Sequence, residues 1–228
     1  MCGAVLAHAV VIVNICGTTL DEYVELARIL SDARGVHAIE LNISCPNIKE
    51  GGITFGCSLP GTHDVVSAVR KVTRLPVIPK LTPNVTDVAS FARAAEEAGA
   101  DAVSLVNTFL AMAIDVHTRR PKLANIVGGL SGPAIRPIAV RMVYECRRAV
   151  KIPIIGMGGI ATSDDVLEFM IAGANAVQVG TMNFVDPFIW GKLMDGVREY
   201  MTTHAIARLQ DIVVTVDTSA RETAWLST

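Results

Sequence analysis

Short apolar runs rich in β-branched residues alternate along the chain with stretches whose apolar residues recur at helical spacing. This alternation is typical of repeated strand–helix units, in which the strands pair in parallel and the helices cover the sheet. The predicted strands are 10–15, 37–43, 77–81, 102–107, 154–158 and 176–180. The pattern therefore favours one α/β domain over residues 1–228.

Three stretches between these strands, 19–32, 86–98 and 162–172, have a clear apolar face. The residues that share a face are Leu20, Tyr23, Ala27 and Leu30 in the first, Val88, Phe91, Ala92 and Ala95 in the second, and Val166, Leu167, Met170 and Ile171 in the third. Acidic residues in the first turn and a glycine after the last turn mark the ends of the first helix. We expect all three helices to pack on the sheet.

An internal repeat supports the parallel arrangement. The sequence AGADAV at 98–103 returns as AGANAV at 172–177. In both places a helix ends, a glycine provides a left-handed C-terminal cap, and a strand begins at once. Two equivalent joints predict repeated βα units.

The number of strands limits the architecture. A closed (β/α)₈ barrel has eight strands and roughly 250 residues, whereas this chain of 228 residues provides six predicted strands. We therefore expect an incomplete TIM barrel with about six of the eight βα units, and the first two units are the ones expected to be lacking. Segment 109–129 interrupts the alternation and is interpreted as an excursion or hairpin lid.

Composition excludes several classes of protein. Lys and Arg number 20 against 22 Asp and Glu, so there is no basic excess to bind nucleic acid or an anionic membrane. Charged residues make up 18% and the mean hydropathy is +0.44, which excludes a disordered chain. The longest apolar run, 4–16, is too short to cross a bilayer and lacks the basic start of a signal peptide. We expect a cytoplasmic protein.

The cysteines do not predict a metal site. The five cysteines form no C-x-x-C pair, so neither a zinc nor an iron–sulfur site is expected in this chain. Their odd number favours reduced thiols. Cys16 and Cys146 are interpreted as core residues, in contrast to Cys45, which follows a strand.

Every predicted strand ends in a polar residue or glycine. These residues are Asn14, Asn42 with Cys45, Lys80, Asn107 with Thr108, Gly158 with Gly159, and Gly180 with Thr181. A single asparagine at such a position is often only a turn residue. Six strands that all end in this way predict a functional site, because parallel α/β proteins build their sites at the carboxyl ends of the strands.

The segment NISCPN at 42–47 contains the candidate nucleophile or base. Cys45 would leave the strand in a loop fixed by Pro46, and an accessible thiolate can act as a general base. Asn42 and Asn47 offer amide donors and acceptors to a planar, amide-like ligand. Two alternatives stay open: Cys45 is a buried loop thiol, or Cys57 on the same loop is the reactive cysteine.

Lys80 and three glycine-rich segments predict binding of an anion. A lysine at a strand end suits an anion, a Schiff base or a reduced flavin, and the alternative is a solvated surface lysine. The segments 158–159, 180–181 and 128–133 resemble loops that hold phosphate with bare backbone N–H groups.

At these residues the chain resembles the class 1B dihydroorotate dehydrogenases, specifically their catalytic subunit. The matching blocks are ELNISCPN at 40–47, KLTPN at 80–84, VNT at 106–108, GGLSGPA at 128–134, IIGMGGI at 154–160 and residues 176–181. The blocks follow the order of the family from about residue 11 to 197, and the last thirty or so residues match poorly.

The resemblance implies an FMN-binding (β/α)₈ barrel that oxidises dihydroorotate to orotate in de novo pyrimidine (UMP) biosynthesis. The FMN contacts it implies are Asn14, Asn42, Lys80, Val106, Gly132, Gly158, Gly159, Gly180 and Thr181. The substrate contacts it implies are Asn42, Asn47, Asn107 and Thr108. Cys45 would take the C5 proton, C6 would deliver hydride to flavin N5, and Lys80 would stabilise the reduced flavin. Electrons would pass to a partner subunit with FAD and a 2Fe–2S cluster and then to NAD, within a heterotetramer that contains a homodimer of the catalytic subunit.

The first two βα units of the family have no counterpart here, so the resemblance implies an N-terminally truncated barrel. Such a barrel would expose two sheet edges and apolar surface, and we expect weak FMN binding and little turnover from this chain alone. Three other interpretations of the function of this chain remain. They are a dihydropyrimidine dehydrogenase-like pyrimidine reductase whose base lies near Cys57, an aldolase-type barrel that forms a Schiff base on Lys80, and an inactive remnant that binds no flavin.

Overall fold

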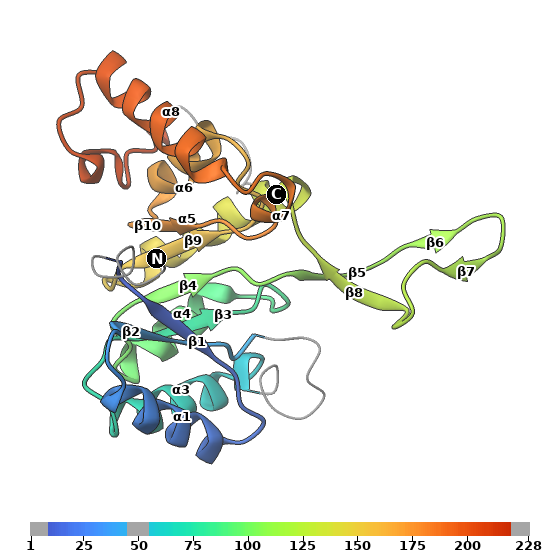
Figure 1. Ribbon diagram of the computed structural model, residues 1–228, viewed down its shortest axis with the longest axis vertical. Coiled ribbons are helices and arrows are strands. Elements are labelled where there is room, and N and C mark those ends of the chain that lie inside the picture. Colours follow the sequence, from blue (N-terminus) through green and yellow to red (C-terminus); the bar gives the residue numbers. More distant parts are fainter. Residues whose placement is uncertain (1–8, 45–54, 220–228) are drawn as a thin grey trace, which may run out of the picture.

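The computed structural model describes residues 9–44 and 55–219, and six parallel strands form its main sheet (Figure 1). In chain order the strands are β1 (Ile12–Ile15), β2 (Ala38–Leu41), β3 (Val77–Leu81), β4 (Val103–Leu105), β9 (Ile154–Met157) and β10 (Ala176–Gln178). They lie side by side in that order, and each neighbouring pair is parallel. Every observed strand lies within its predicted range, so the prediction of six parallel βα units is confirmed.

Helices cover the outer face of this sheet. They are α1 (Leu20–Asp32), α3 (Leu59–Arg70), α4 (Val88–Glu97), α5 (Arg136–Ala149), α6 (Ser163–Ala172), the short α7 (Met182–Val185) and α8 (Ile189–Thr203), with 3₁₀ turns at Pro133–Ile135 and Leu209–Ile212. Contacts between neighbours run from α1 to α3, α4, α5, α6 and α8 in turn. No helix in the described part of the chain has the length and apolar character that a membrane crossing requires.

Side-chain caps fix where two of the predicted helices begin. Thr19 caps α1 and forms a reciprocal capping box with Glu22. Thr162 and Asp165 form the same arrangement at α6. Each box satisfies backbone N–H groups that have no partner inside the helix, which is why these helices start at the predicted residues.

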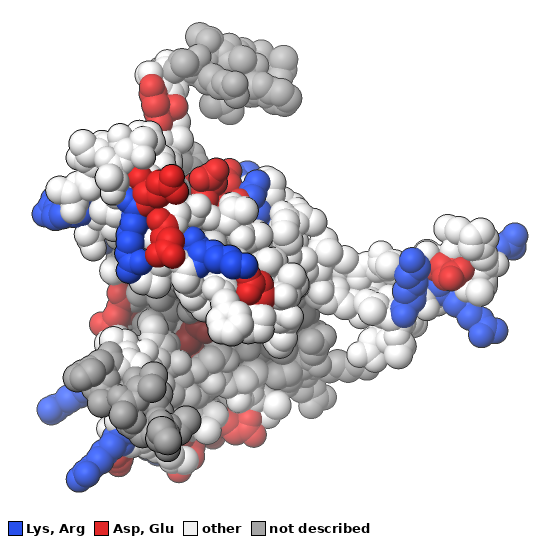
Figure 2. Space-filling view, turned by 45° about the horizontal axis from the view of Figure 1, so that its top comes forward, with Lys and Arg blue, Asp and Glu red and all other residues white. Residues whose placement is uncertain are grey.

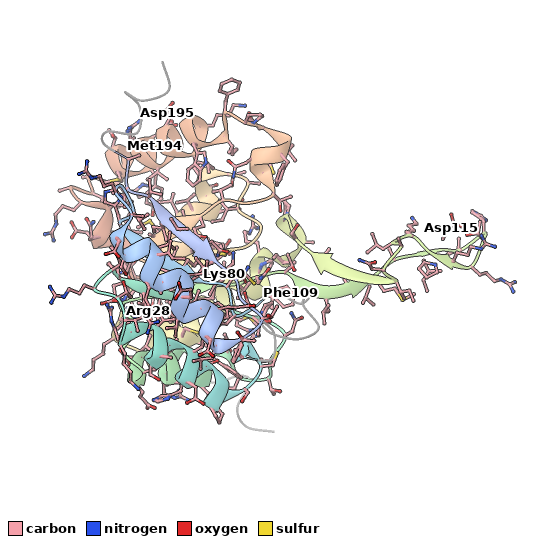
Figure 3. All side chains as sticks on the ribbon, turned by 60° about the horizontal axis from the view of Figure 1, so that its bottom comes forward. Arg28, Lys80, Phe109, Asp115, Met194 and Asp195 are labelled. Carbon is pink, nitrogen blue, oxygen red and sulfur yellow. The ribbon has the colours of Figure 1, made fainter. Side chains whose placement is uncertain are left out.

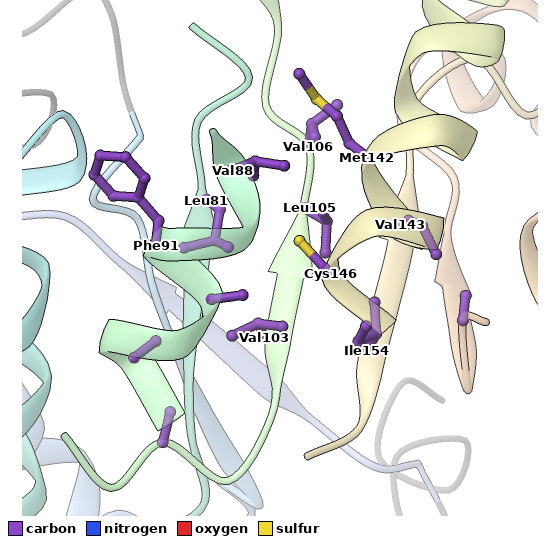
Figure 4. Packing of buried hydrophobic residues seen from close by; sticks show 14 of the residues in the cluster. Leu81, Val88, Phe91, Val103, Leu105, Val106, Met142, Val143, Cys146 and Ile154 are labelled. Atoms are coloured by element: carbon purple, nitrogen blue, oxygen red, sulfur yellow. The ribbon is translucent and has the colours of Figure 1, made fainter. Parts of the chain in front are cut away.

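The core lies between the sheet and the helices. Outward-facing strand residues such as Val103, Leu105 and Ile154 pack against α4 and α5 (Figure 4). Apart from Leu20, the residues of the predicted apolar helix faces are buried or partly buried in this core, as expected. Cys146 is also buried there. Cys16 is exposed, so its interpretation as a core residue is wrong: it follows β1, an edge strand of the described sheet.

The sheet curls around its inner face. Gln178 on β10 donates a hydrogen bond of 3.0 Å from Nε2 to Oε1 of Glu40 on β2, although β3, β4 and β9 separate these two strands in the sheet. Side chains from strands so far apart can meet only across the interior of a curved sheet. The described sheet is therefore an open half-barrel, with β1 and β10 as its edges.

Segment 109–130 forms a long hairpin. Its stem pairs β5 (Phe109–Met112) with β8 (Val127–Leu130), and its far part pairs β6 (Ile114–Asp115) with β7 (Arg120–Pro121). Figure 1 shows the hairpin extending away from the body. The predicted excursion is thus a hairpin, and its function as a lid stays a prediction. The interpretation of all of 128–133 as a phosphate loop is wrong, because Gly128 and Gly129 are paired strand residues in β8.

The glycines that follow α1 and α6 allow the cost of a steric clash to be separated from the cost of backbone strain. Gly35 (φ +84°) and Gly173 (φ +128°) both have positive φ, but a Cβ on Gly35 would meet nothing within 4 Å, whereas a Cβ on Gly173 would lie 2.6 Å from Cβ of Arg147. We expect Gly35→Ala to lower the free energy of unfolding by about 1 kcal/mol. Gly173→Ala should cost about 1–3 kcal/mol more because it also overpacks the α5–α6 contact. Urea denaturation of the two variants measures the difference, and equal losses would contradict the steric argument.

Candidate active site

A cavity opens at the carboxyl ends of β3, β4, β9 and β10. The predicted residues that line the cavity are Lys80, Val106, Asn107, Thr108, Gly132, Gly158, Gly159, Gly180 and Thr181. The other lining residues, Ser131, Ile135, Met157, Ile160, Gln178 and Val179, were not predicted. The structure thus brings together most of the residues that follow the predicted strands.

Bare backbone forms one wall of the cavity. At Gly159 (φ +80°), a Cβ would lie 2.7 Å from the carbonyl oxygen of Gly132 and 3.0 Å from the backbone nitrogen of Arg136. At Gly180, a Cβ would meet nothing within 4 Å, so the backbone there faces open space. Gly159 is thus packed closely against Gly132 and Arg136, whereas an open backbone such as that of Gly180 suits close contact with a phosphate or a flat ring.

A carboxylate of α6 itself occupies the backbone N–H groups at the start of this helix. The carboxylate of Asp165 accepts hydrogen bonds of 2.8 Å from the backbone N–H groups of both Ala161 and Thr162. Asp165 also pairs with Arg136. Because the helix's own carboxylate occupies these donors, the phosphate interpretation is restricted to the backbone of Gly158, Gly159 and Gly180.

Lys80 brings a positive charge to the cavity. It lies at the end of β3 and is half-buried among the lining residues (Figure 3). Among the described residues, no carboxylate lies within 4.0 Å of its ammonium group. A lysine held in a cavity without an acidic partner favours binding of an anionic group.

Two of the predicted asparagines lie side by side. Nδ2 of Asn107 donates to Oγ of Ser44 at 2.9 Å, and Oγ of Ser44 donates to Oδ1 of Asn42 at 3.0 Å. The hydroxyl of Tyr23, which is fully buried, donates to the backbone carbonyl of Asn42 at 2.8 Å. Helix α1 therefore fixes the position of the end of β2. Ser44 was not predicted to belong to the site, although it lies within the NISCPN segment.

Asn84 joins this cluster to the hairpin. Its Nδ2 donates to the carbonyl oxygen of Thr108 at 3.1 Å, and its Oδ1 accepts from the backbone N–H of Leu110 at 3.0 Å. The KLTPN block contains Asn84, but its partners come from a distant segment and cannot be read from the sequence.

Asn14 is placed beside a buried carboxylate rather than on the cavity wall. Its Nδ2 donates to Oε2 of Glu40 at 2.6 Å. Glu40 and its partner Gln178 were both missed by sequence reasoning. A glutamate in the apolar run AIEL was an available signal, because an acidic residue on a buried strand needs compensating partners.

The thiols differ in their environments. Cys45 and Asn47 lie outside the described residues. Cys57 is exposed, yet partial burial raises the pKa of its thiol. Burial raises the pKa of Cys146 to about 12. Among the described residues, no three potential metal ligands come together.

Charges of both signs are interspersed on the body of the molecule in the face that Figure 2 shows, and cationic side chains gather on the far part of the hairpin. These cations include Arg119, Arg120 and Lys122, beside Asp115. The strongest cationic feature in that face is thus distant from the cavity.

The curled parallel sheet and its strand-end cavity define a site of the TIM-barrel type. A family model described as dihydroorotate dehydrogenase matches residues 5–201. The chain belongs to the dihydroorotate dehydrogenase family.

Curated relatives support this assignment. The chain is 52% identical over 202 residues to "Dihydroorotate dehydrogenase B (NAD(+)), catalytic subunit" of Porphyromonas gingivalis, covering 89% of this chain and 66% of the relative. It is 53% identical over 203 residues to the protein of the same name from Alkaliphilus oremlandii, covering 89% and 67%. The chain thus spans about two thirds of the length of these relatives.

A solved structure supports the fold. The structure of DHODH from Eimeria tenella, determined with ferulenol, matches with a TM-score of 0.79 at 22% identity, over 93% of this chain and 63% of that one. At this identity the match is evidence for the barrel fold alone.

The raised thiol pKa values predict slow alkylation. A thiol whose pKa is raised forms its reactive thiolate only at higher pH. We therefore expect the rate at which iodoacetamide modifies Cys57 to keep rising as the pH passes about 8.5, the ordinary pKa of a cysteine thiol. Buried Cys146, with a pKa of about 12, should stay unmodified in the folded chain at pH 9 and react after unfolding in urea. Mass spectrometry of tryptic peptides measures both, and rapid labelling of folded Cys146 would contradict its placement in the core.

Proposed function

We propose that this protein takes part in pyrimidine biosynthesis as the catalytic subunit of an NAD-linked dihydroorotate dehydrogenase, which oxidises dihydroorotate to orotate. The observation that carries the proposal is the strand-end cavity, in which backbone, amides and a lysine without an acidic partner among the described residues surround one space. The names of the relatives agree with it.

The residues of the cavity fit FMN. Bare peptide groups at Gly158, Gly159 and Gly180 can approach a phosphate, and Lys80 offers a charge without an acidic partner. The residues proposed to hold FMN are Asn14, Asn42, Lys80, Val106, Gly132, Gly158, Gly159, Gly180 and Thr181. When bound, FMN would supply the acceptor for the hydride that leaves C6 of dihydroorotate.

The amide cluster suits the substrate. Dihydroorotate has ring amide groups and a carboxylate, and Asn42, Asn107 and Thr108 offer donors and acceptors. Ser44 already holds Asn42 and Asn107 in place, and Asn107 accepts from the backbone N–H of Thr108. Fixed amides orient a planar ring without loss of side-chain entropy at the moment of binding. Asn47 would complete this set.

Cys45 is proposed as the base. Its thiolate would take the proton from C5 while the hydride leaves C6, so that the C5–C6 double bond of orotate forms and the thiol carries the proton. The positive charge of Lys80 would favour negative charge that develops in the cavity during this step.

The proposal includes a partner. The words "catalytic subunit" and "NAD(+)" in the names of the relatives imply a second subunit that passes electrons to NAD. We propose that this subunit carries FAD and a 2Fe–2S cluster, and that two catalytic subunits form a homodimer within a heterotetramer in the cytoplasm.

The first test is flavin binding by the purified chain. We expect FMN fluorescence to be quenched saturably but with weak affinity, and turnover to be slow, because β1 and β10 leave the described half-barrel open.

Gly159→Val should weaken FMN binding at least about ten-fold, since the valine side chain would collide with Gly132 and Arg136. Gly191→Ala is the matched control, because a Cβ there meets nothing within 4 Å. Absence of quenching would refute the proposed flavin site, and rapid turnover would refute the expectation for this chain alone.

The second test identifies the base. In the absence of oxygen, dihydroorotate should bleach the visible absorbance of the bound flavin once, which can be followed even where turnover is slow. We expect Cys45→Ser to slow this bleaching by about a hundred-fold or more, the usual range for loss of a general base, and Cys57→Ser to leave the rate within two-fold of the unmodified chain. The opposite result would favour the dihydropyrimidine dehydrogenase-like reading.

A further inference from the structure

A buried carboxylate lies inside the half-barrel and belongs to none of the groups used so far. Glu40 on β2 is only 4% exposed. Among the described residues no Lys, Arg or His lies within 4.0 Å of its carboxylate. Burial of a carboxylate without a cation is costly, and apolar residues usually stabilise a core better. A carboxylate in such a place therefore calls for a role other than stability.

Three donors from three other strands converge on Glu40. Oε2 accepts from Nδ2 of Asn14 on β1 at 2.6 Å. Oε1 accepts from Oγ of Ser104 on β4 at 2.7 Å and from Nε2 of Gln178 on β10 at 3.0 Å. Two of these donors are amide nitrogens, which can only donate, so Glu40 accepts a hydrogen bond at each of its two oxygens.

The carboxylate sets the direction of both amides. An amide that turns its nitrogen toward Glu40 turns its oxygen away from Glu40. Gln178 also lines the cavity together with Lys80, whereas Glu40 does not. The hydrogen bond to Glu40 thus makes Gln178 present an acceptor, its Oε1, as the polar atom free for a ligand in the cavity.

We propose that Glu40 is a positioning residue of the flavin site, and that it orients Gln178 so that the amide oxygen of Gln178 accepts a hydrogen bond from the ring N–H of FMN. The oxidised flavin ring has a single N–H group, at N3, so the proposal specifies one ligand atom. This inference rests on the proposed flavin site and adds a pair of residues, of which Gln178 contacts the edge of the flavin ring and Glu40 orients Gln178.

The test compares FMN with FMN methylated at N3, which lacks that N–H. The dissociation constant of each for the purified chain is measured by quenching of flavin fluorescence. The unmodified chain should bind FMN about ten-fold more tightly than the methylated form, the factor that corresponds to one hydrogen bond. Gln178→Met, which removes the acceptor and leaves Glu40 its bonds to Asn14 and Ser104, should abolish this preference by weakening FMN alone.

Variants of Glu40 separate a positioning role from a merely structural one. Glu40→Leu removes both acceptor oxygens, so nothing holds the amide of Gln178 in one direction, and the preference for FMN should fall. Glu40→Asp keeps the charge and the bond to neighbouring β1, but its shorter side chain cannot reach across the interior to β10, so it should lose the same preference. Glu145→Gln, at an exposed ion pair with Arg141, is the control that should keep the preference.

Thermal unfolding followed by circular dichroism shows whether each variant is folded. A structural role alone would lower the melting temperature and weaken both flavins equally, and that result would overturn the proposal. Equal binding of the two flavins by the unmodified chain would overturn it as well, while leaving the flavin site in place. If Gln178→Met weakens orotate and leaves the flavin preference unchanged, then Gln178 contacts the substrate and the assignment to flavin is wrong. Absence of any FMN binding would instead refute the proposed function.

Discussion

Alternation of side chains across a curled parallel sheet is the constraint on which the rest of this structure depends. Successive residues of a strand face opposite sides, so β2 directs Ile39 and Leu41 to the helices and Ala38 and Glu40 to the interior. The outer set can be uniformly apolar because helices cover it. The inner set fills the concave side of the sheet, where the side chains come closer together as the sheet curves. Polar groups placed there must find hydrogen-bond partners on strands across the interior. The Glu40 cluster is the result of that requirement, and the cavity opens directly beyond it.

The two walls of the cavity have different chemistry. On the side of β9 and β10 the backbone itself is the surface, because glycines leave the peptide groups bare. On the side of β4 the surface includes the amide of Asn107, which donates to Ser44 and accepts from the backbone N–H of Thr108. Lys80 stands between the two walls on β3. A ligand with a phosphate at one end and a flat polar ring at the other matches this division.

Most of the fold and much of the site could be predicted because they depend on local signals. Apolar periodicity gave all six strands, capping residues such as Thr19 and Thr162 marked helix starts, and the residues after the strands formed the cavity lining. Most of the failures depend on contacts far away in the chain, whereas the failure at the start of α6 is local. Glu40 and Gln178 meet only because the sheet curls, and Asn84 finds its partners at the hairpin base. Cys16 is exposed because β1 is an edge, and the donors before α6 are occupied by Asp165, whose position three residues after Thr162 was a readable capping signal.

The edge position of β1 has a consequence for handling the protein. No described strand pairs with its outer side, and Val10 and Ile12 beside that edge are 76% and 40% exposed. Unpaired strand edges with apolar side chains are templates on which another extended chain can add. Self-association through this edge would increase with protein concentration. Ligand binding by the monomer should therefore be measured in dilute samples.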